Sequence, residues 1–441
     1  MSCMLKKVST TIGTGTATAI DLDTTLVGSV VPVESMSGKC VRYNYRLRVS
    51  NKMQRLLLDE WNTKRWVWNR CVQESQKAYA EFLEDPNNKR DLSMIELSRM
   101  LTIWRSEHDW LRAGSSVVQQ QTVRDFTKAR SKAIKDIAKH VPQTKRRGMP
   151  RFKSKHRDQP SLGYTLAGFS LKTYGEDSKV RVHLASGIVV RPVWSRPLPT
   201  PPSSLNIYRD ATGAWWISFV VKVAPEPLPA TNQKIGIDWG VNEIATTTDT
   251  HYDLSHPEYG KKAQKDLANG QRKMAKRKPE KGHSASKGYK DAKRQVALSY
   301  QKVARQRQDT ARKWAKHVVR DHDEIAAEDF YPKFISKTTM ARKALDAAIA
   351  ATKAELIYMA DKHQRVLVLV NPSKTTMECS VCGAIAKHRL ELSERVYTCE
   401  VCGLEMPRDK NSAKVLLNRA GFDPVVPKDV RLGSLLKTHA A

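Results

Sequence analysis

The stretch Ile235–Val241, with the sequence IGIDWGV, decides the fold class of the second half of the chain. It is apolar and β-rich, and it places Asp238 inside a strand, where an unpaired carboxylate would be costly. Two more short apolar strands are predicted downstream, at 324–330 and 366–370, with an Ala-rich helix at 341–360 between them. This alternation of strands and helices predicts an α/β core that is interrupted by insertions.

Two further acids occupy positions that suit metal binding. Glu328 lies at the end of the second predicted strand, and Asp409 opens a stretch typical of the first turn of a helix. Taken singly, Asp409 is better explained as a helix N-cap, and a paired structural acid is a fair explanation of Asp238. Taken together in a basic protein, Asp238, Glu328 and Asp409 indicate a cluster for divalent cations. Hard oxygen ligands favour Mg²⁺, and two such ions roughly 4 Å apart would activate water for phosphodiester hydrolysis.

Two Cys-x-x-Cys pairs, separated by 16 residues, have the spacing of a tetrahedral metal site. A glycine follows each pair, at Gly383 and Gly403, and permits the tight turn that such a site needs. Four thiolates fill the coordination sphere, so the pattern predicts one structural zinc ion with no open position for catalysis. The predicted ligands are Cys379, Cys382, Cys399 and Cys402; His388 is interpreted as a surface residue, and Cys3, Cys40 and Cys71 as unliganded.

The charge of the chain indicates a polyanionic partner. The 441 residues, enough for about three domains, carry 76 Lys and Arg against 45 Asp and Glu, a net charge of +31. Residues 128–157 (net +11) and 261–320 (net +16) hold most of this excess, which favours a nucleic-acid groove over two solvated helix faces. No apolar run approaches the roughly 18 residues of a membrane span, and the N-terminus lacks a signal-peptide core. We therefore expect a cytosolic, nucleic-acid-binding protein without a membrane partner.

The N-terminal half alternates between strand-like and helix-like segments. A period-two strand is predicted within 36–50, and helical spacing begins at Asn51. The remaining predictions are helices at 93–104 and 116–137, a basic connector at 141–160, strands at 179–183 and 187–190, a hairpin of 205–209 with 214–223, and a Pro-rich linker at 224–230.

These motifs occur in an order that resembles the TnpB proteins of insertion sequences and the compact type V CRISPR nucleases similar to them. Ile235–Val241 resembles the first RuvC motif of that family, Ala327–Phe330 (AEDF) the second and Arg408–Ala413 (RDKNSA) the third. Pro150–Lys155 (PRFKSK) resembles its basic connector, and Gln54–Cys71 its first recognition helix. The resemblance covers roughly residues 36–420.

The resemblance implies a multidomain α+β fold. An N-terminal β-barrel-like wedge domain would carry an inserted helical recognition domain, and a C-terminal RNase H-like (RuvC) α/β domain would carry an inserted four-cysteine zinc ribbon. The expected boundaries are 1–50 and 141–228 for the wedge, 51–140 for recognition, 229–372 for the first two RuvC motifs with a basic helical insert at 261–320, 373–407 for the ribbon, 408–422 for the third motif and 423–441 for a tail.

The resemblance further implies an RNA-guided DNA endonuclease of the prokaryotic cytosol, associated with the nucleoid. Guide RNA and target DNA would be its partners, and both a monomer and a homodimer are compatible with the sequence. Asp238, Glu328 and Asp409 would be the catalytic ligands of two Mg²⁺ ions, and Asp329 would have a structural part. Departures from the family pattern are Trp239, Pro407 and Ser412, none of which removes a metal ligand.

Two other functions remain compatible with the sequence. A nuclease-inactive or weakly active RNA-guided DNA-binding protein would share every feature except working acids. A guide-independent zinc-ribbon protein that binds nucleic acid would need no acids at all. A transposon and a CRISPR array are equally compatible sources of the guide.

Overall fold

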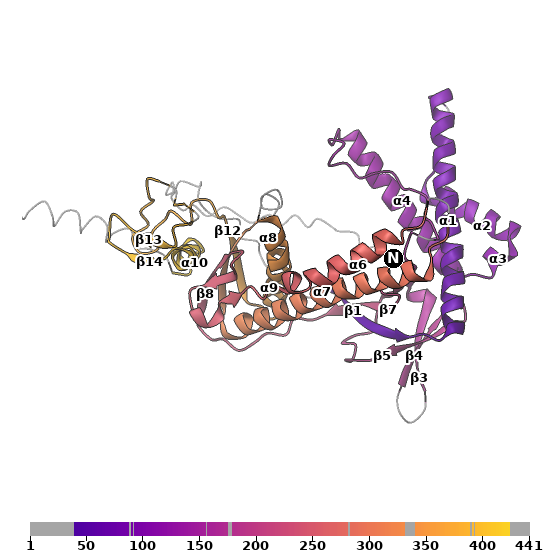
Figure 1. Cartoon of the computed structure of the whole chain (residues 1–441). Coiled ribbons are helices and arrows are strands. Elements are labelled where there is room, and N and C mark those ends of the chain that lie inside the picture. Colours follow the sequence, from indigo (N-terminus) through magenta and orange to yellow (C-terminus); the bar gives the residue numbers. More distant parts are fainter. Residues whose placement is uncertain are drawn as a thin grey trace, which may run out of the picture.

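Two β-sheets connected by helices organise the chain in the computed structural model (Figure 1). The structure describes residues 39–423, except 88–89, 91, 156, 175–178, 281–282, 331–339, 389 and 392. The start of the predicted wedge (residues 1–38) and nearly all of the predicted tail (423–441) therefore lie outside the described residues. Within the described part, no helix is both long enough and apolar enough to cross a membrane.

The first sheet has seven antiparallel strands in the order β2-β6-β7-β1-β5-β4-β3. Buried and more exposed side chains alternate along its strands. In β1, for example, Tyr45 and Leu47 are buried in the same core as Phe219 of β7. The predicted hairpin of 205–209 with 214–223 is confirmed, whereas β2 and β3 were not predicted. The strands are β1 (Lys39–Arg48), β2 (Ser161–Thr165), β3 (Phe169–Tyr174), β4 (Lys179–Leu184), β5 (Val189–Val193), β6 (Ser204–Arg209) and β7 (Trp215–Val223), with a 3-10 turn, η1, at Leu166–Gly168.

The expectation of a β-barrel-like sheet is wrong. The edge strands β2 and β3 do not pair with each other among the described residues, so the sheet stays open. Helices cover the β2 edge instead: the buried Lys64 ammonium of α1 donates to the Ser161 carbonyl at 2.8 Å, and Gln121 of α4 packs beside Gly163. Covering an edge strand protects its unpaired backbone groups as well as barrel closure does.

The helical unit inserted after β1 consists of α1 (Asn51–Glu84), α2 (Met94–Glu107), α3 (Asp109–Arg112) and α4 (Ser116–Ala138). Helix α1 begins where the Ser50 hydroxyl accepts the Met53 amide at 3.2 Å, a typical N-cap. Apolar side chains spaced for helices, including Val67, Leu101 and Phe126, form one core. The three helices predicted from periodicity are confirmed to within a few residues, and only the short α3 was not predicted.

Two connecting segments are fixed rather than free. In the basic connector, Lys153 exchanges two backbone hydrogen bonds with the Asn69 side chain, at 2.7 and 3.0 Å, and its ammonium lies 3.8 Å from the Trp68 ring centroid. In the Pro-rich linker, the Glu226 amide donates to the Lys362 carbonyl at 2.8 Å and the two side chains form an ion pair at 2.9 Å. The linker is therefore docked on the second half of the protein.

The second sheet has the order β10-β9-β8-β11-β12, with β8, β9 and β10 antiparallel and β8, β11 and β12 parallel. Its odd-numbered residues in β8 and β11, such as Ile237 and Ala327, face α7 and α9, and Ala326 faces α10. The predicted helix at 341–360 is broken at Ala348, which has φ 53°. The elements are β8 (Lys234–Trp239), β9 (Glu243–Thr247), η2 (Thr250–Tyr252), β10 (Leu254–Ser255), β11 (Glu324–Glu328), α8 (Ala341–Ala347), α9 (Ile349–Lys362), β12 (Val366–Val370) and α10 (Arg408–Arg419).

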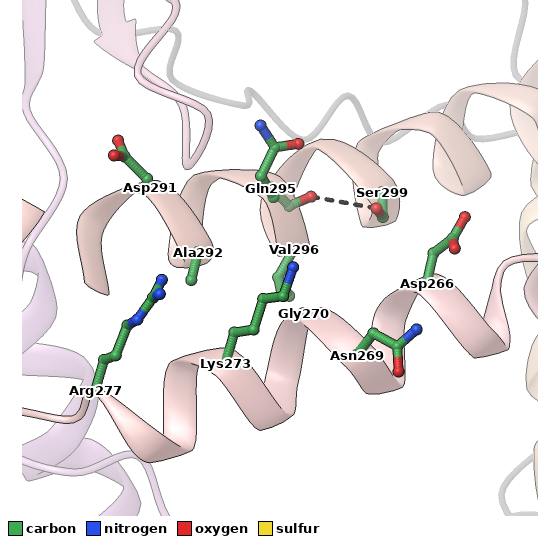
Figure 2. Close-up of a pocket in the computed structure, with 10 residues that line it drawn as sticks. All are labelled: Asp266, Asn269, Gly270, Lys273, Arg277, Asp291, Ala292, Gln295, Val296 and Ser299. Carbon is green, nitrogen blue, oxygen red and sulfur yellow. Dashed lines mark hydrogen bonds between the residues drawn. The ribbon is translucent and has the colours of Figure 1, made fainter. Parts of the chain in front are cut away.

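The basic segment 261–320 forms α5 (Tyr259–Lys262), α6 (Gln264–Lys276) and the long α7 (Lys287–Asp321). The C-terminal half of α7 packs in the core of the second sheet through Trp314 and Val318, and its N-terminal half extends toward the first sheet (Figure 1). Figure 2 shows α6 lying along α7, with Gly270 facing Val296. A Cβ at Gly270 would lie 2.6 Å from a Val296 methyl group, so the close approach of the two helices requires glycine there.

Between β12 and α10 the chain forms a small two-stranded unit, β13 (Val396–Thr398) paired with β14 (Glu405–Pro407). Its core is made of Cys379, Cys399 and the fully buried Tyr397. A unit this small has too little apolar interior to be stable alone.

Candidate metal centres

Asp238 and Glu328 lie side by side at the ends of two parallel strands. The register pairs Ile237 of β8 with Ala327 of β11, so the next residue on each strand is one of the two acids. Because side chains alternate along a strand, both acids point to the α10 face, opposite the face occupied by Ile237 and Ala327.

A close contact between β8 and α10 brings the third acid to the same face. Gly236 approaches α10 so closely that a Cβ added there would lie 2.0 Å from the Ala413 carbonyl oxygen. Asp409 is one helical turn before Ala413, and Asp238 is two residues after Gly236 on the same strand face. The contact therefore directs the start of α10 toward the end of β8. The predicted helix start at Asp409 is confirmed, since α10 begins at Arg408.

The electrostatics of the three acids confirm that they are neighbours. Burial raises the pKa of Asp238 well above its usual range, and the charges of Glu328 and Asp409 raise it further. Burial also raises the pKa of Glu328, although the Trp239 amide, which donates to its carboxylate at 3.3 Å, opposes that shift. Two adjacent carboxyl groups that resist ionisation are stabilised as anions when a cation lies between them.

Asp409 occupies the more exposed side of this cluster. Its carboxylate accepts a hydrogen bond from Arg408 at 3.2 Å and pairs with Arg395 at 3.8 Å. The ligand atoms of the three acids are not all within 4.8 Å of one another. The oxygen donor set nonetheless fits hard divalent cations, because carboxylates that share ions need not touch one another.

Sequence reasoning missed several side chains that hold the acids in place. Trp239 is buried, and its indole N–H donates to the Glu328 backbone carbonyl at 3.0 Å. Lys410 pairs with Asp253 at 2.7 Å and fixes α10 to the edge of the sheet. Lys353 of α9 pairs with Asp329, and the charges of both side chains act on Glu328. The sequence carries only weak signals of these contacts, because the partners are distant: Lys410 and Asp253, for example, are 157 residues apart.

The four predicted cysteines form one cluster. Their sulfur atoms all lie within 4.8 Å of one another, and two of the pairs, Cys379 with Cys402 and Cys382 with Cys399, are 3.6 Å apart. A tetrahedron with metal–sulfur bonds of about 2.3 Å has edges of about 3.8 Å, so the spacing fits a single ion such as zinc. In the part of the chain that is described, this is the one group of three or more Cys, His or acidic ligand atoms drawn so close together.

The local backbone explains how the cysteines come together. Gly383 and Gly403 have φ of +72° and +74°, and each amide donates back to the first cysteine of its pair, at 3.0 and 2.9 Å. Burial raises the pKa of the Cys382 thiol to about 12. Cys40 and Cys71 lie elsewhere, in β1 and α1, and Cys3 is outside the described residues.

The cysteine cluster is tied directly to the helix that carries Asp409. Asn411 is fully buried; its side-chain oxygen accepts the Ser380 amide at 3.0 Å and its amide nitrogen donates to the Glu378 carbonyl at 2.6 Å. Asn418 donates to the Ser380 carbonyl at 2.7 Å, further along α10. The first cysteine knuckle and the start of α10 therefore move as one unit.

Comparison with known proteins matches the same segments. A family model described as "Probable transposase" (OrfB_IS605) matches residues 218–336, and the model of the "Cas12f1-like, TNB domain" matches residues 351–416. The first contains Asp238 and Glu328, and the second contains the four cysteines and Asp409. The chain is similar to the TnpB and Cas12f proteins. The resemblance seen in the sequence is thereby confirmed.

Individual relatives match about half of the chain or more. A Streptomyces pristinaespiralis protein described as "Putative RNA-guided DNA endonuclease" is 27% identical over 383 residues, which is 85% of this chain and 88% of that protein. The TnpB-like protein L79 of Acanthamoeba polyphaga mimivirus is 25% identical over 249 residues, 52% of this chain and 45% of that protein.

The fold is shared with one solved structure. The chain in "Cryo-EM structure of the Cas12f1-sgRNA-target DNA complex" superposes with a TM-score of 0.53 at 12% identity, covering 87% of this chain and 99% of that chain. A mixed α+β fold with several units, as expected, is therefore shared with Cas12f1.

Proposed function

We propose that this chain is an RNA-guided DNA endonuclease. The observation that carries the proposal is the meeting of Asp238, Glu328 and Asp409 on the α10 face of the second sheet, in a chain related to TnpB and Cas12f proteins. The name of the Streptomyces relative and the guide RNA and target DNA in the Cas12f1 complex support the choice of partners. The net charge of +31 supports binding to both polymers.

In the proposed reaction, the three acids would hold two Mg²⁺ ions, which would supply an activated water and stabilise the leaving oxygen of the phosphodiester. Asp238 and Glu328 provide the shared, buried side of the site, and Asp409 closes its exposed side. Trp239 holds Glu328 from behind through its amide and indole N–H groups, so that this carboxylate is oriented before DNA arrives. Arg408 keeps Asp409 in place and lies close enough to lower the pKa of Asp238.

The other units have supporting parts in this proposal. The open first sheet (39–50 and 141–228) is the wedge, and 51–140 is the helical recognition unit that faces the guide–target heteroduplex. The second sheet and α10 form a RuvC-like nuclease unit (229–372 and 408–422). The cysteine unit (373–407) is a zinc ribbon, whose ion would be structural because four thiolates leave no open position.

A cleavage assay tests the proposal. The full chain, purified with its RNA, is given Mg²⁺ and DNA that matches the sequence of that RNA. Asp238→Asn removes one metal ligand with little change in volume, and we expect cutting to fall below detection while guide-dependent DNA binding persists. Asp309→Asn is the matched control, because Asp309 is an exposed acid of α7 that pairs with Lys313 at 2.7 Å. Undiminished cutting by Asp238→Asn would refute the site, and wild-type chain that binds but never cuts would favour the nuclease-inactive alternative.

A further inference from the structure

An open cleft lies where the first sheet meets the N-terminal half of α7, and the endonuclease mechanism above does not use it. Its volume is about 700 Å³. Trp216 of β7 lines the cleft together with four arginines: Arg46 of β1, Arg209 of β6, and Arg294 and Arg305 of α7. The Arg46 and Arg305 guanidiniums each lie 5.6 Å from the Trp216 ring centroid.

These four arginines have no carboxylate partner. None forms an ion pair with any residue that the structure describes, whereas Arg307 and Arg312, on the same helix, pair with Asp346 and Glu355 at 2.6 and 3.1 Å. Burial lowers the pKa of Arg209, as expected for a guanidinium that has lost water without gaining an anion. Four cations that line one cleft without an ion-pair partner repel one another, and an anion bound between them would relieve that repulsion.

The ring of Trp216 is held in position before any ligand arrives. Its indole N–H donates to Asp210 at 2.8 Å, and Gln301 of α7 donates to the same carboxylate oxygen at 3.0 Å. The other oxygen of Asp210 accepts the Thr212 and Ala214 amides, at 2.9 and 3.0 Å. Asp210 is thus fully occupied by hydrogen bonds, and it also links the sheet to α7, so the cleft is preformed.

We infer that this cleft binds an unpaired nucleotide of the guide RNA, with the base against Trp216 and the flanking phosphates among the four arginines. Unstacked RNA bases are bound in this way, on aromatic rings and guanidinium planes. The inference rests on the proposed function, which supplies the RNA, and it assigns a part of the RNA outside the paired guide segment, where bases remain unpaired.

The position of the cleft favours RNA over the DNA strand that is cut. Trp314 of α7 packs on Trp239, with ring centroids 5.8 Å apart, and Trp239 is next to Asp238. Arg305 is nine residues before Trp314 and Arg294 twenty, which is about 14 and 30 Å along a helix. The cleft is therefore remote from the acids. A site at that distance suits the guide RNA, which stays bound through the reaction, better than it suits the DNA strand that is cut at the acids.

The inference is tested by the binding of a labelled eight-uridine RNA to the full chain, which is stripped of nucleic acid and kept in buffer without Mg²⁺ and without a chelator that would remove zinc. Arg294→Gln with Arg305→Gln should weaken binding at least tenfold. It should also reduce the slope of log affinity against log salt by about 1.4, because two phosphate contacts are lost. Trp216→Leu should weaken binding about tenfold with the slope unchanged, since stacking carries no charge. Lys302→Gln with Lys316→Gln is the control, with the same charge change at exposed positions of α7 outside the cleft.

Crosslinking then identifies the polymer. Cells supplied with 4-thiouridine yield chain with its own RNA, and irradiation should join that RNA to the peptide that contains Trp216. Losses no larger than those of the control pair, or no RNA crosslink at Trp216, would overturn the inference; a crosslink there to DNA alone would do the same. The binding assay contains no DNA and no Mg²⁺, so its failure is distinguishable from failure of the endonuclease proposal.

Discussion

The contact between Gly236 and Ala413 gives the sharpest prediction about the site, because one methyl group should disable it. In Gly236→Ala the new Cβ would lie 2.0 Å from the Ala413 carbonyl oxygen, against the 3.4 Å at which ordinary contact begins. Relieving the clash requires α10 and β8 to separate by about 1.4 Å. Asp409 is carried by α10 and Asp238 by β8, the two elements that would separate. The distance between the two acids should therefore widen by a similar amount.

The expected cost is much larger for catalysis than for folding. A misplacement of about 1 Å lowers rates by roughly 100-fold in well-aligned sites, so we expect at least this loss in single-turnover cleavage of guide-matched DNA. Overpacking of this kind costs about 1–3 kcal/mol of stability, which a chain of this size should survive. Electron paramagnetic resonance of bound Mn²⁺ should report weaker binding without relying on turnover.

Gly163→Ala is the matched control for this experiment. Gly163 is also a strand glycine, in β2, but its added Cβ would lie no closer than 3.7 Å to any neighbour, the Gln121 Cγ. The control should cut DNA at close to the wild-type rate. A folded Gly236→Ala chain that cuts DNA and binds Mn²⁺ like the wild type would refute the claim that this contact sets the position of Asp409.

Three further predictions concern the same region. Asp238→Asn should raise the unfolding temperature, measured without added divalent cation, by about 2–4 °C, roughly 1 kcal/mol, because it removes a buried carboxyl group whose ionisation beside Glu328 is unfavourable. Mg²⁺ should then stabilise the wild type but not the variant in a melting experiment. Cys379→Ser with Cys382→Ser should eliminate zinc from the purified chain by mass spectrometry and open residues 373–407 to protease, whereas Cys40→Ser should do neither. Asn411→Ala should cost about 2–4 kcal/mol, because it leaves two buried backbone groups unpaired, and should speed hydrogen exchange at the Ser380 amide; unchanged exchange there would contradict the tie between the ribbon and α10.

Local patterns in the sequence predicted most of the elements, because the period of the apolar residues is a local property. The strand before Asp238, the helix that begins at Arg408 and the cysteine cluster were all predicted in this way. The adjacency of Asp238 and Glu328 follows from parallel pairing, which apolar strands separated by a long helix favour but do not fix.

What the sequence left out depends on contacts between distant segments. The need for glycine at 236 arises from Ala413, and the brace on α10 arises from Asp253 and Lys410, pairs that no local pattern marks. The open first sheet has the same origin, because its edge is covered by helices whose strand-facing residues, such as Lys64, resemble ordinary surface positions in the sequence. The order of the motifs in the sequence predicted the function. The contacts that would make this function possible appear only in the packed structure.

The most direct measurement is the location of metal ions in the full chain with its RNA, crystallised with Mn²⁺ and recorded at the manganese absorption edge. The account predicts anomalous peaks within about 2.2 Å of carboxylate oxygens of Asp238 and Glu328, with Asp409 on the exposed side of the same site. Ordered manganese elsewhere in the chain, with no peak beside these acids, would contradict it.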